Sequence, residues 1–295
     1  MKVAAAAYPL DFLDSWQSYE DKLAAWVSKA AGQGAELLVF PEYGAVELAT
    51  LAGRDVACDL EASLHAVADR LDQADAVHLD LARMYGVHIL AASGPATGDP
   101  RPANRARLIT PDGAIGVQDK QIMTRFERDI WEVAPGGPLQ IFDTDVGRVG
   151  ILICYDCEFP LLRRALADVD LLLVPSCTEA LSGYWRVRIG AMARALEAQC
   201  VSIMSSLVGS VDWSEAVDVN TGTGGIFGPP DKGFPENGVL AVGKIDEPGW
   251  TYADVDLAAI AEVRRDGVVL NRTHWGEQTP RHQSVTSRSL RTKNP

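Results

Sequence analysis

The chain has 295 residues and a formal charge of −13, from 27 lysines and arginines against 40 aspartates and glutamates. A chain this acidic repels phosphate backbones, which excludes nucleic acid as its main partner, and no apolar run reaches the length of a membrane helix. Five cysteines are a small and odd number for a chain of this length, which does not fit a disulfide framework. We therefore expect reduced thiols in a soluble, cytoplasmic protein.

Apolar runs that alternate with helical patterns predict a mixed α/β fold of helices covering a sheet. Strands are expected at 2–8, 36–40, 87–93 and 170–175, hairpins at 105–120 and 139–154, and short strands between 201 and 254. The helical patterns cover 15–32, 60–85, 160–168, 183–199 and 257–265. Segments 35–42 and 170–177 resemble each other, since each follows a helix and carries a proline at the end of its strand. This echo suggests two similar half-units packed sheet against sheet.

Chemically reactive side chains follow several predicted strands. Glu42 follows VFP, Lys120 follows VQD, Cys154 follows LI and Cys177 follows VPS. Ligands of α/β sheets bind beyond the carboxyl ends of the strands. A carboxylate can accept the proton of a thiol, and an ammonium can stabilise both the thiolate and an oxyanion. These three groups therefore suffice for acyl transfer without histidine, and we expect the helix start at Pro160 and a nearby lysine to lower the thiol pKa.

Each of these residues also has a plainer interpretation. A free cysteine is often a small buried hydrophobe, Glu42 would serve as a turn or helix cap, and Lys120 as an exposed charge. The pattern Cys154-Tyr-Asp-Cys157 also fits a thiol–disulfide module, because it lies between a strand and a helix. A binding protein without catalytic activity is a further alternative. For Cys157 we expect packing beneath the helix start, with reversible oxidation against Cys154 as a minor alternative.

Three motifs resemble those of one family in order and spacing: FPE at 40–42, DKQIMTRFE at 119–127 and GILICYDCEFP at 150–160. Over roughly residues 2–260 the chain resembles the nitrilase, or carbon–nitrogen hydrolase, superfamily. The resemblance implies the roles of four side chains and one backbone group. They are Glu42 as general base, Lys120 as electrostatic stabiliser, Cys154 as nucleophile, Glu127 as the second glutamate that orients Lys120 and the substrate, and the N–H of Tyr155 as an oxyanion donor beside Lys120.

The resemblance further implies a four-layer α-β-β-α sandwich with an approximate internal two-fold. It places a single carbon–nitrogen hydrolase domain at 1–270 and an extension at 271–295, expected to be a dimer arm or a partly disordered basic tail. Members usually form homodimers or larger homo-oligomers, here through the helix after Cys154 and the helix at 183–199. The segment 175–199 looks like an uncharacterised branch whose relatives are sometimes fused to an acetyltransferase.

Two departures from the family pattern concern the substrate. Tyr155-Asp156 follows the nucleophile, as in amide-hydrolysing branches, where the nitrile-hydrolysing branch has Trp-Glu. Glu158-Phe-Pro-Leu replaces the common Arg-Phe-Pro-Glu, which alters the charges near the site. The resemblance thus implies cysteine-dependent hydrolysis of a small carboxamide or N-carbamoyl compound through a thioester, releasing ammonia or an amine. Nitrile hydrolysis and acyl transfer are alternatives on the same site, and neither a metal nor an organic cofactor is expected.

Residues near the same strand ends are candidates for the substrate pocket. Those that follow Glu42 or the strand at 170–175 are Tyr43, Cys177, Thr178, Glu179, Tyr184 and Trp185. For the rings of Tyr184 and Trp185, a place in the aromatic core or at a subunit interface is an equal alternative.

Overall fold

The structure is a computed structural model that describes residues 1–291. Its strands form a 13-stranded sheet with the central order β5-β4-β3-β2-β1-β9-β8-β7-β6. The two middle strands, β1 (Lys2–Pro9) and β9 (Val201–Ser210), pair in parallel over a short ladder, in which Ala7 lies opposite Ser206. This ladder joins two half-sheets near the carboxyl ends of their central strands.

The two half-sheets have matching topology. In the first, β1 has parallel β2 on one side and antiparallel β13 on the other, and in the second, β9 has parallel β8 and antiparallel β11. The first half consists of β1, β2 (Leu37–Val39), β3 (His88–Ala96), β4 (Ala103–Ile109), β5 (Ile115–Asp119) and β13 (Gly249–Asp254). The second consists of β9, β6 (Ile141–Thr144), β7 (Gly147–Ile151), β8 (Leu171–Ser176), β10 (Val219–Asn220), β11 (Gly225–Phe227) and β12 (Val239–Val242). Strands β2 and β8 occupy equivalent positions, each as the parallel neighbour of the central strand of its half-sheet. The similarity between segments 35–42 and 170–177 therefore reflects the internal two-fold.

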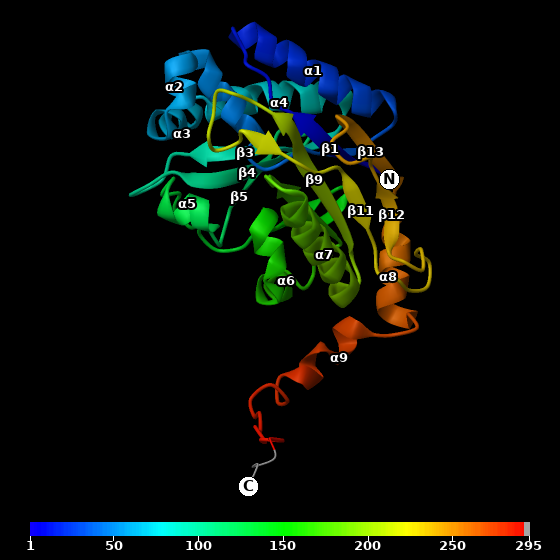
Figure 1. The fold of residues 1–295 in the computed structure, drawn as a ribbon. Helices are drawn as coiled ribbons and strands as arrows, with labels where there is room; N and C mark the ends of the chain where they lie inside the picture. The colour runs from blue at the N-terminus through cyan, green and yellow to red at the C-terminus, as the bar shows by residue number, and fades with distance from the viewer. Residues whose placement is uncertain (292–295) are drawn as a thin grey trace.

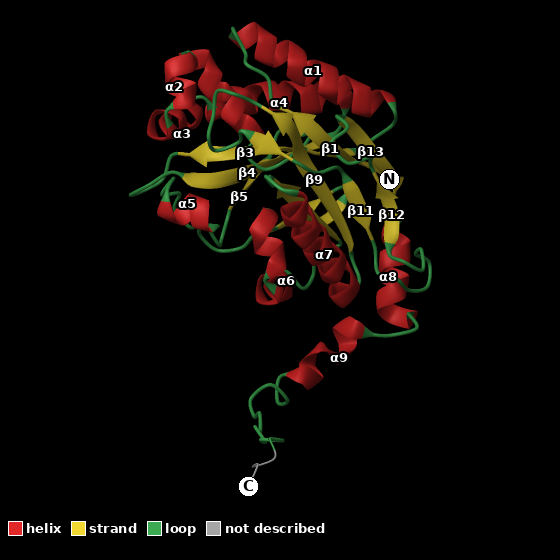
Figure 2. Cartoon of the chain, in the orientation of Figure 1, coloured by secondary structure: helices red, strands yellow, loops and turns green. Residues whose placement is uncertain are grey.

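Alternating side chains of the strands face two different cores. On β1, Ala4 and Tyr8 belong to the cluster that includes helices α1 (Trp16–Gly32) and α4 (Leu71–Tyr85), whereas Val3 and Ala5 belong to the cluster between the half-sheets. Helix α7 (Leu181–Ala198) contributes Ala191 and its neighbours to this second cluster. In Figures 1 and 2, α1 and α4 cover one side of the strands, and α6 and α7 lie on the other. The predicted α-β-β-α layers are therefore confirmed.

The expected helix at 60–85 is wrong in one respect, because it consists of two helices. Helix α3 (Leu60–Ala68) packs on the 3₁₀ helix η1 (Gly44–Ala52), and α4 packs on α1. The break falls at Asp69 and Arg70. The Arg70 side chain donates a hydrogen bond to the carbonyl of Ala66 at 2.8 Å, which satisfies a carbonyl in the last turn of α3 that has no acceptor role within the helix. A single straight helix could not pack on both η1 and α1 in this way. The periodicity of apolar residues alone does not reveal that the helix breaks between them.

Shorter helices complete the described chain. They are α2 (Arg54–Cys58), α5 (Arg125–Asp129), η2 (Cys154–Glu158), α6 (Pro160–Ala165), α8 (Leu257–Asp266) and α9 (Asn271–Gln278). Beyond α9 the chain leads away from the body (Figure 1), and residues 282–291 are exposed. The last part of the predicted basic tail, 292–295, lies outside the described residues. None of the helices formed by residues 1–291 combines the length and hydrophobicity that a bilayer span requires.

Candidate active site

Glu42 lies just beyond the carboxyl end of β2, and its side chain is only 1% exposed. Its oxygen Oε1 accepts hydrogen bonds from Lys120 Nζ at 2.7 Å and from Asn104 Nδ2 at 3.0 Å. Its other oxygen, Oε2, accepts the backbone N–H of Cys177 at 3.0 Å. The next residue, Tyr43, has a left-handed φ of 57°. Such a φ is uncommon for a residue other than glycine, and it turns the chain sharply after the carboxylate.

Lys120 directly follows β5 and forms a buried ion pair with Glu127 of the short helix α5. The Lys120 ammonium lies 2.7 Å from both carboxylate oxygens of Glu127. The Glu127 carboxylate also accepts Tyr43 Oη at 2.6 Å, and the backbone N–H and hydroxyl of Thr124 at 2.8 Å each. Thr124 and Glu127 form a capping box that begins α5. The local sequence TRFE therefore places the second glutamate while it starts the helix.

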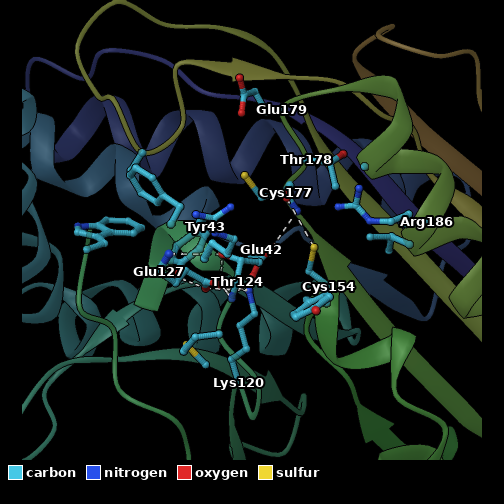
Figure 3. Close-up of a pocket in the computed structure, with 18 of the residues that line it drawn as sticks. Glu42, Tyr43, Lys120, Thr124, Glu127, Cys154, Cys177, Thr178, Glu179 and Arg186 are labelled. Carbon is cyan, nitrogen blue, oxygen red and sulfur yellow. Dashed lines mark hydrogen bonds and ion pairs between the residues drawn. The ribbon is translucent and has the colours of Figure 1, made fainter. Parts of the chain in front are cut away.

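Cys154 is the first residue of η2, just beyond β7, and is 4% exposed. Its φ of 50° is left-handed, a conformation that costs a residue other than glycine roughly 1–3 kcal/mol and is concentrated at functional sites. This sharp turn carries the sulfur into the cavity, where Sγ lies 3.6 Å from the carbonyl oxygen of Cys177. Figure 3 shows the Cys154 sulfur and the Glu42 carboxylate directed toward the Cys177 backbone.

The charges at this centre support one another. Burial alone would lower the pKa of Lys120, but the carboxylates of Glu127 and Glu42 outweigh it and hold that pKa well above its usual value. Burial opposes ionisation of Glu127 as well, yet the Lys120 ammonium lowers its pKa overall. For Glu42, burial and the nearby Glu127 dominate over Lys120 and raise the pKa to about 7. Glu42 is thus poised to exchange a proton near neutral pH.

The expectation of an acidic thiol is wrong. Burial, followed by the Glu42 carboxylate, raises the pKa of Cys154 well above its usual value, and Lys120 offsets only part of this increase. The thiol is therefore neutral until a base removes its proton, and the position of Glu42 becomes decisive.

These groups line a single cavity of about 990 Å³, a size typical of small-molecule sites. Among the residues predicted for the pocket, Tyr43, Cys177, Thr178 and Glu179 line it, together with Tyr155. Its walls also contain Glu158, which the sequence placed near the site, and Arg186, for which the sequence favoured a structural ion pair over binding of a substrate carboxylate. Other lining side chains were not singled out by the sequence: Ile122, Met123, Arg125, Phe126, Arg128, Trp131, Phe159, Val187, Glu215 and Asp218. The Glu158 carboxylate is paired with Arg186 of α7 at 3.4 Å. The negative charge that follows the nucleophile segment is therefore balanced by this arginine.

Two predicted pocket residues, Tyr184 and Trp185, do not line this cavity. Tyr184 is 1% exposed in the core beneath α7, and Trp185 is 43% exposed on the opposite side of the helix. The helical period explains the difference, because Gly183, Arg186 and Val187 occupy the face of α7 that borders the cavity. The alternative of an aromatic core is therefore the correct one for Tyr184, whereas a subunit interface at the exposed Trp185 stays a prediction.

Cys157 is a buried packing residue, as expected, but its sulfur packs against α7 and not only beneath the helix start at Pro160. It is fully buried, and its sulfur lies 3.5 Å from the carbonyl oxygen of Val187 in α7. A side chain on Gly190 would place its Cβ 2.8 Å from this sulfur, so the close approach of α7 depends on glycine there. Cys154 and Cys157 are both free thiols, on a turn that directs them to different surroundings.

Two positioning residues were missed at the sequence level. Asn104 of β4 is fully buried; its amide nitrogen donates to Glu42, its side-chain oxygen accepts Ser93 Oγ at 2.7 Å, and its carbonyl accepts the Lys120 N–H at 2.9 Å. Ser93 of β3 in turn accepts the N–H of Tyr43 at 3.1 Å. An uncharged polar side chain inside the pattern ANRARLI was the available signal, but its partner became apparent only from the tertiary structure.

Within residues 1–291, no group of three or more His, Cys, Asp or Glu side chains is arranged to hold a metal ion. The carboxylates at the site are instead neutralised by Lys120.

The carbon-nitrogen hydrolase family model matches residues 2–265. A probable hydrolase of Bacillus subtilis, YhcX, is 30% identical over 91% of this chain and 52% of its own length. The deaminated glutathione amidase of Yersinia enterocolitica is 30% identical over 44% of this chain and 50% of its own length. The aligned parts thus span about half the length of both relatives.

Among solved structures, a carbon-nitrogen hydrolase from Helicobacter pylori G27 has the same fold. It superimposes with a TM-score of 0.72 over 90% of this chain and 92% of its own, at 18% sequence identity. The fold and the family match over residues 2–265 agree with the motifs that surround Glu42, Lys120 and Cys154. The chain therefore belongs to the carbon-nitrogen hydrolase family.

Proposed function

We propose that the protein hydrolyses a small carboxamide or N-carbamoyl compound through a thioester on Cys154. The observation that carries this proposal is the junction of Glu42 and Lys120 with the left-handed Cys154 turn in one cavity. A buried carboxylate near neutral pKa, a permanent ammonium and a thiol supply a base, an electrostatic stabiliser and a nucleophile.

In the acylation step, Glu42 takes the thiol proton and the sulfur attacks the carbonyl carbon. Oxygen Oε1 already accepts two donors, whereas Oε2 accepts one backbone N–H from the residue whose carbonyl contacts the thiol. We therefore assign the proton transfer to Oε2. The negative carbonyl oxygen is stabilised by the Lys120 ammonium and by the N–H of Tyr155, which lies in the first turn of η2, where N–H groups have no helical acceptor.

Collapse of this tetrahedral intermediate breaks the C–N bond, and Glu42 returns its proton to the leaving nitrogen. In the second step, Glu42 removes a proton from water, the hydroxide attacks the thioester, and cleavage of the C–S bond releases the acid. The proton on Glu42 then restores the thiol. Glu127 keeps Lys120 charged and in place throughout both steps, since their contact is 2.7 Å and buried.

The direct test is ammonia release across a panel of primary amides, N-carbamoyl compounds and ω-amido acids. We expect release from at least one class, a hydroxamate when hydroxylamine is present, and an acyl adduct mapped to Cys154 by mass spectrometry. A protein that acts on none of these classes and forms no adduct would contradict the proposal. The amidase activity named for the Yersinia relative supports amides, and matched amide and nitrile substrates will show whether nitriles react faster.

A thiol–disulfide function receives no comparable support. It would need Cys157 to exchange with external thiols, but that sulfur is fully buried against α7. It also leaves the buried Glu42, Lys120 and Glu127 without a task. All five cysteines, which lie within the described residues, are free thiols, and this supports our proposal that the protein works in the reducing cytoplasm.

The pH dependence of catalysis follows from Glu42. Only the ionised carboxylate can accept the thiol proton, and its pKa is raised to about 7, so kcat/KM should fall as the pH decreases through about 7. Glu127 does not limit this range, because its pKa is lowered and it stays charged. The measurement is kcat/KM from about pH 5 to pH 9 with the best amide of the panel. A rate that stays constant down to about pH 5 would show that a different group is the base.

We also propose that α7 forms an interface with a second copy of this chain. Trp185, Ile189 and Leu196 expose 43%, 61% and 44% of their surfaces along one side of this helix, and none of them lines the cavity. Exposed apolar side chains in such a row typically mark an association surface. A homodimer or larger homo-oligomer is also the state that the family resemblance implies.

Replacing Ile189 with glutamate should therefore lower the molar mass measured by light scattering. A buried, unpaired charge at an interface is costly, so the subunits are expected to separate. The matched control is Met84→Glu on α4, where the methionine is 71% exposed and far from this row. An unchanged mass for Ile189→Glu, or an equal loss for Met84→Glu, would contradict an interface at α7.

A further inference from the structure

A buried carboxylate joins the two segments that carry Lys120 and Cys154. Asp156 is 1% exposed, and its two oxygens accept three backbone N–H groups. Oδ1 accepts Ile122 N–H at 2.8 Å and Gln121 N–H at 3.2 Å, while Oδ2 accepts Gln121 N–H at 3.1 Å and Ile153 N–H at 3.3 Å. Gln121 and Ile122 directly follow Lys120, and Ile153 directly precedes Cys154. One side chain thus holds both segments.

The remaining contacts of the Lys120 backbone do not reach the nucleophile. Its N–H donates to Asn104 of β4, and its carbonyl accepts Gly136 N–H at 2.8 Å. These bonds fix Lys120 to the first half-sheet and to the loop before β6. Asp156 belongs to the second half, because it follows β7, and it therefore ties the segment after Lys120 to the segment before Cys154.

The same carboxylate also supports the strained turn at the nucleophile. A left-handed Cys154 persists only where the surrounding bonds hold it, and the contact from Asp156 to Ile153 N–H lies at the start of that turn. Three N–H donors favour the ionised form of the carboxylate. Burial opposes this effect and raises the pKa of Asp156 to about 6, so the carboxylate is mostly ionised at neutral pH.

We propose that Asp156 is a positioning residue that holds Lys120 in register with Cys154. This inference rests on the proposed function, because register matters for the ammonium that stabilises the oxyanion. Displacement of a catalytic group by about 1 Å can lower a rate by about 100-fold. We therefore expect Asp156→Asn, which keeps the size but replaces one acceptor oxygen with a donor, to lower kcat by about 10- to 100-fold with KM little changed.

The chain offers a matched control in Asp231, which makes the same kind of contact away from the cavity. Its carboxylate accepts the N–H groups of Lys232, Val268 and Val269 at 2.6, 2.8 and 3.3 Å. Asp231→Asn should reduce thermal stability while kcat is maintained. Should Asp156→Asn fail to fold, Asp156→Glu keeps the charge and lengthens the side chain, and its kcat should fall by a smaller factor.

A second measurement does not depend on the proposed reaction. The rate at which iodoacetamide alkylates Cys154, mapped by mass spectrometry, reports how well the site supports the thiolate. We expect a lower rate in folded Asp156→Asn than in the wild type or Asp231→Asn. The inference would be overturned if Asp156→Asn kept the kcat and the alkylation rate of the wild type. It would also be overturned if Asp231→Asn lost as much kcat and alkylation rate as Asp156→Asn. If the wild type releases no ammonia from any amide, the proposed function fails, and the alkylation rates alone decide the role of Asp156.

Discussion

Replacing Cys154 with alanine is expected to abolish ammonia release from every amide that the wild-type protein hydrolyses. Removal of a nucleophile typically lowers kcat by several orders of magnitude, so we expect a loss of at least about 10⁴-fold. No thioester can form without the sulfur, and the acyl adduct seen by mass spectrometry should disappear with the activity. The protein should still fold, because Cys154 lines the cavity and the contact of its sulfur with the Cys177 carbonyl oxygen is long, at 3.6 Å.

The control for this variant is Cys157→Ser, three positions along the same turn. Its thiol is buried against α7 and faces away from the cavity, so the variant should keep most of its kcat. The serine hydroxyl costs some stability, because the sulfur lies in an apolar environment. Full activity in Cys154→Ala, or loss of catalysis in folded Cys157→Ser, would refute the assigned nucleophile. The second of these results would favour the thiol–disulfide alternative.

Replacing Lys120 with methionine should have the second-largest effect and should act on both catalysis and folding. The variant loses the ammonium that stabilises the oxyanion, for which we expect a decrease in kcat of about 10²- to 10³-fold. It also leaves Glu42 and Glu127 buried without their counter-ion, since both lie 2.7 Å from Lys120. Breaking a buried ion pair in this way typically costs about 3–5 kcal/mol of unfolding free energy. Chemical denaturation and steady-state kinetics measure the two effects separately.

Two further variants separate catalysis from stability. Lys22→Met breaks a similar buried pair, in which Lys22 lies 2.7 Å from Glu47, and it should reduce stability without a comparable loss of kcat. The double variant Lys120→Met/Glu127→Gln removes both an ammonium and an unpaired carboxylate, so it should recover part of the lost stability but no activity. Recovery of kcat in this double variant would mean that Lys120 acts only as a structural counter-ion.

The sequence was most informative where a short segment determines its own structure. The strand ends at Glu42 and Cys154 and the capping box at Glu127 are local features, and the structure brings these residues together around Lys120. The arrangement of helices over a sheet followed equally well, because continuous apolar runs such as that of β1 identify strands covered on both faces. The family motifs supplied the pairing of segments that lie far apart in the chain.

The parts that were not predictable depend on tertiary contacts. Asn104 acquires its role from Glu42, 62 residues away, and nothing near it in the sequence identifies that partner. The break at Asp69 and Arg70 follows from the two surfaces on which α3 and α4 pack. The thiol pKa was predicted in the wrong direction because local charge was considered without the depth of burial, which contributes most.

The short ladder between β1 and β9 has a consequence for when this protein can react. Glu42, Asn104 and Lys120 come from one half of the molecule, and Cys154 and Cys177 come from the other. Before the two halves dock, the chain carries Cys154 without Glu42 and Lys120 beside it, so under our proposal it lacks both the base and the oxyanion stabiliser. Amide hydrolysis is therefore expected only from the docked molecule, in which the ladder between β1 and β9 has formed.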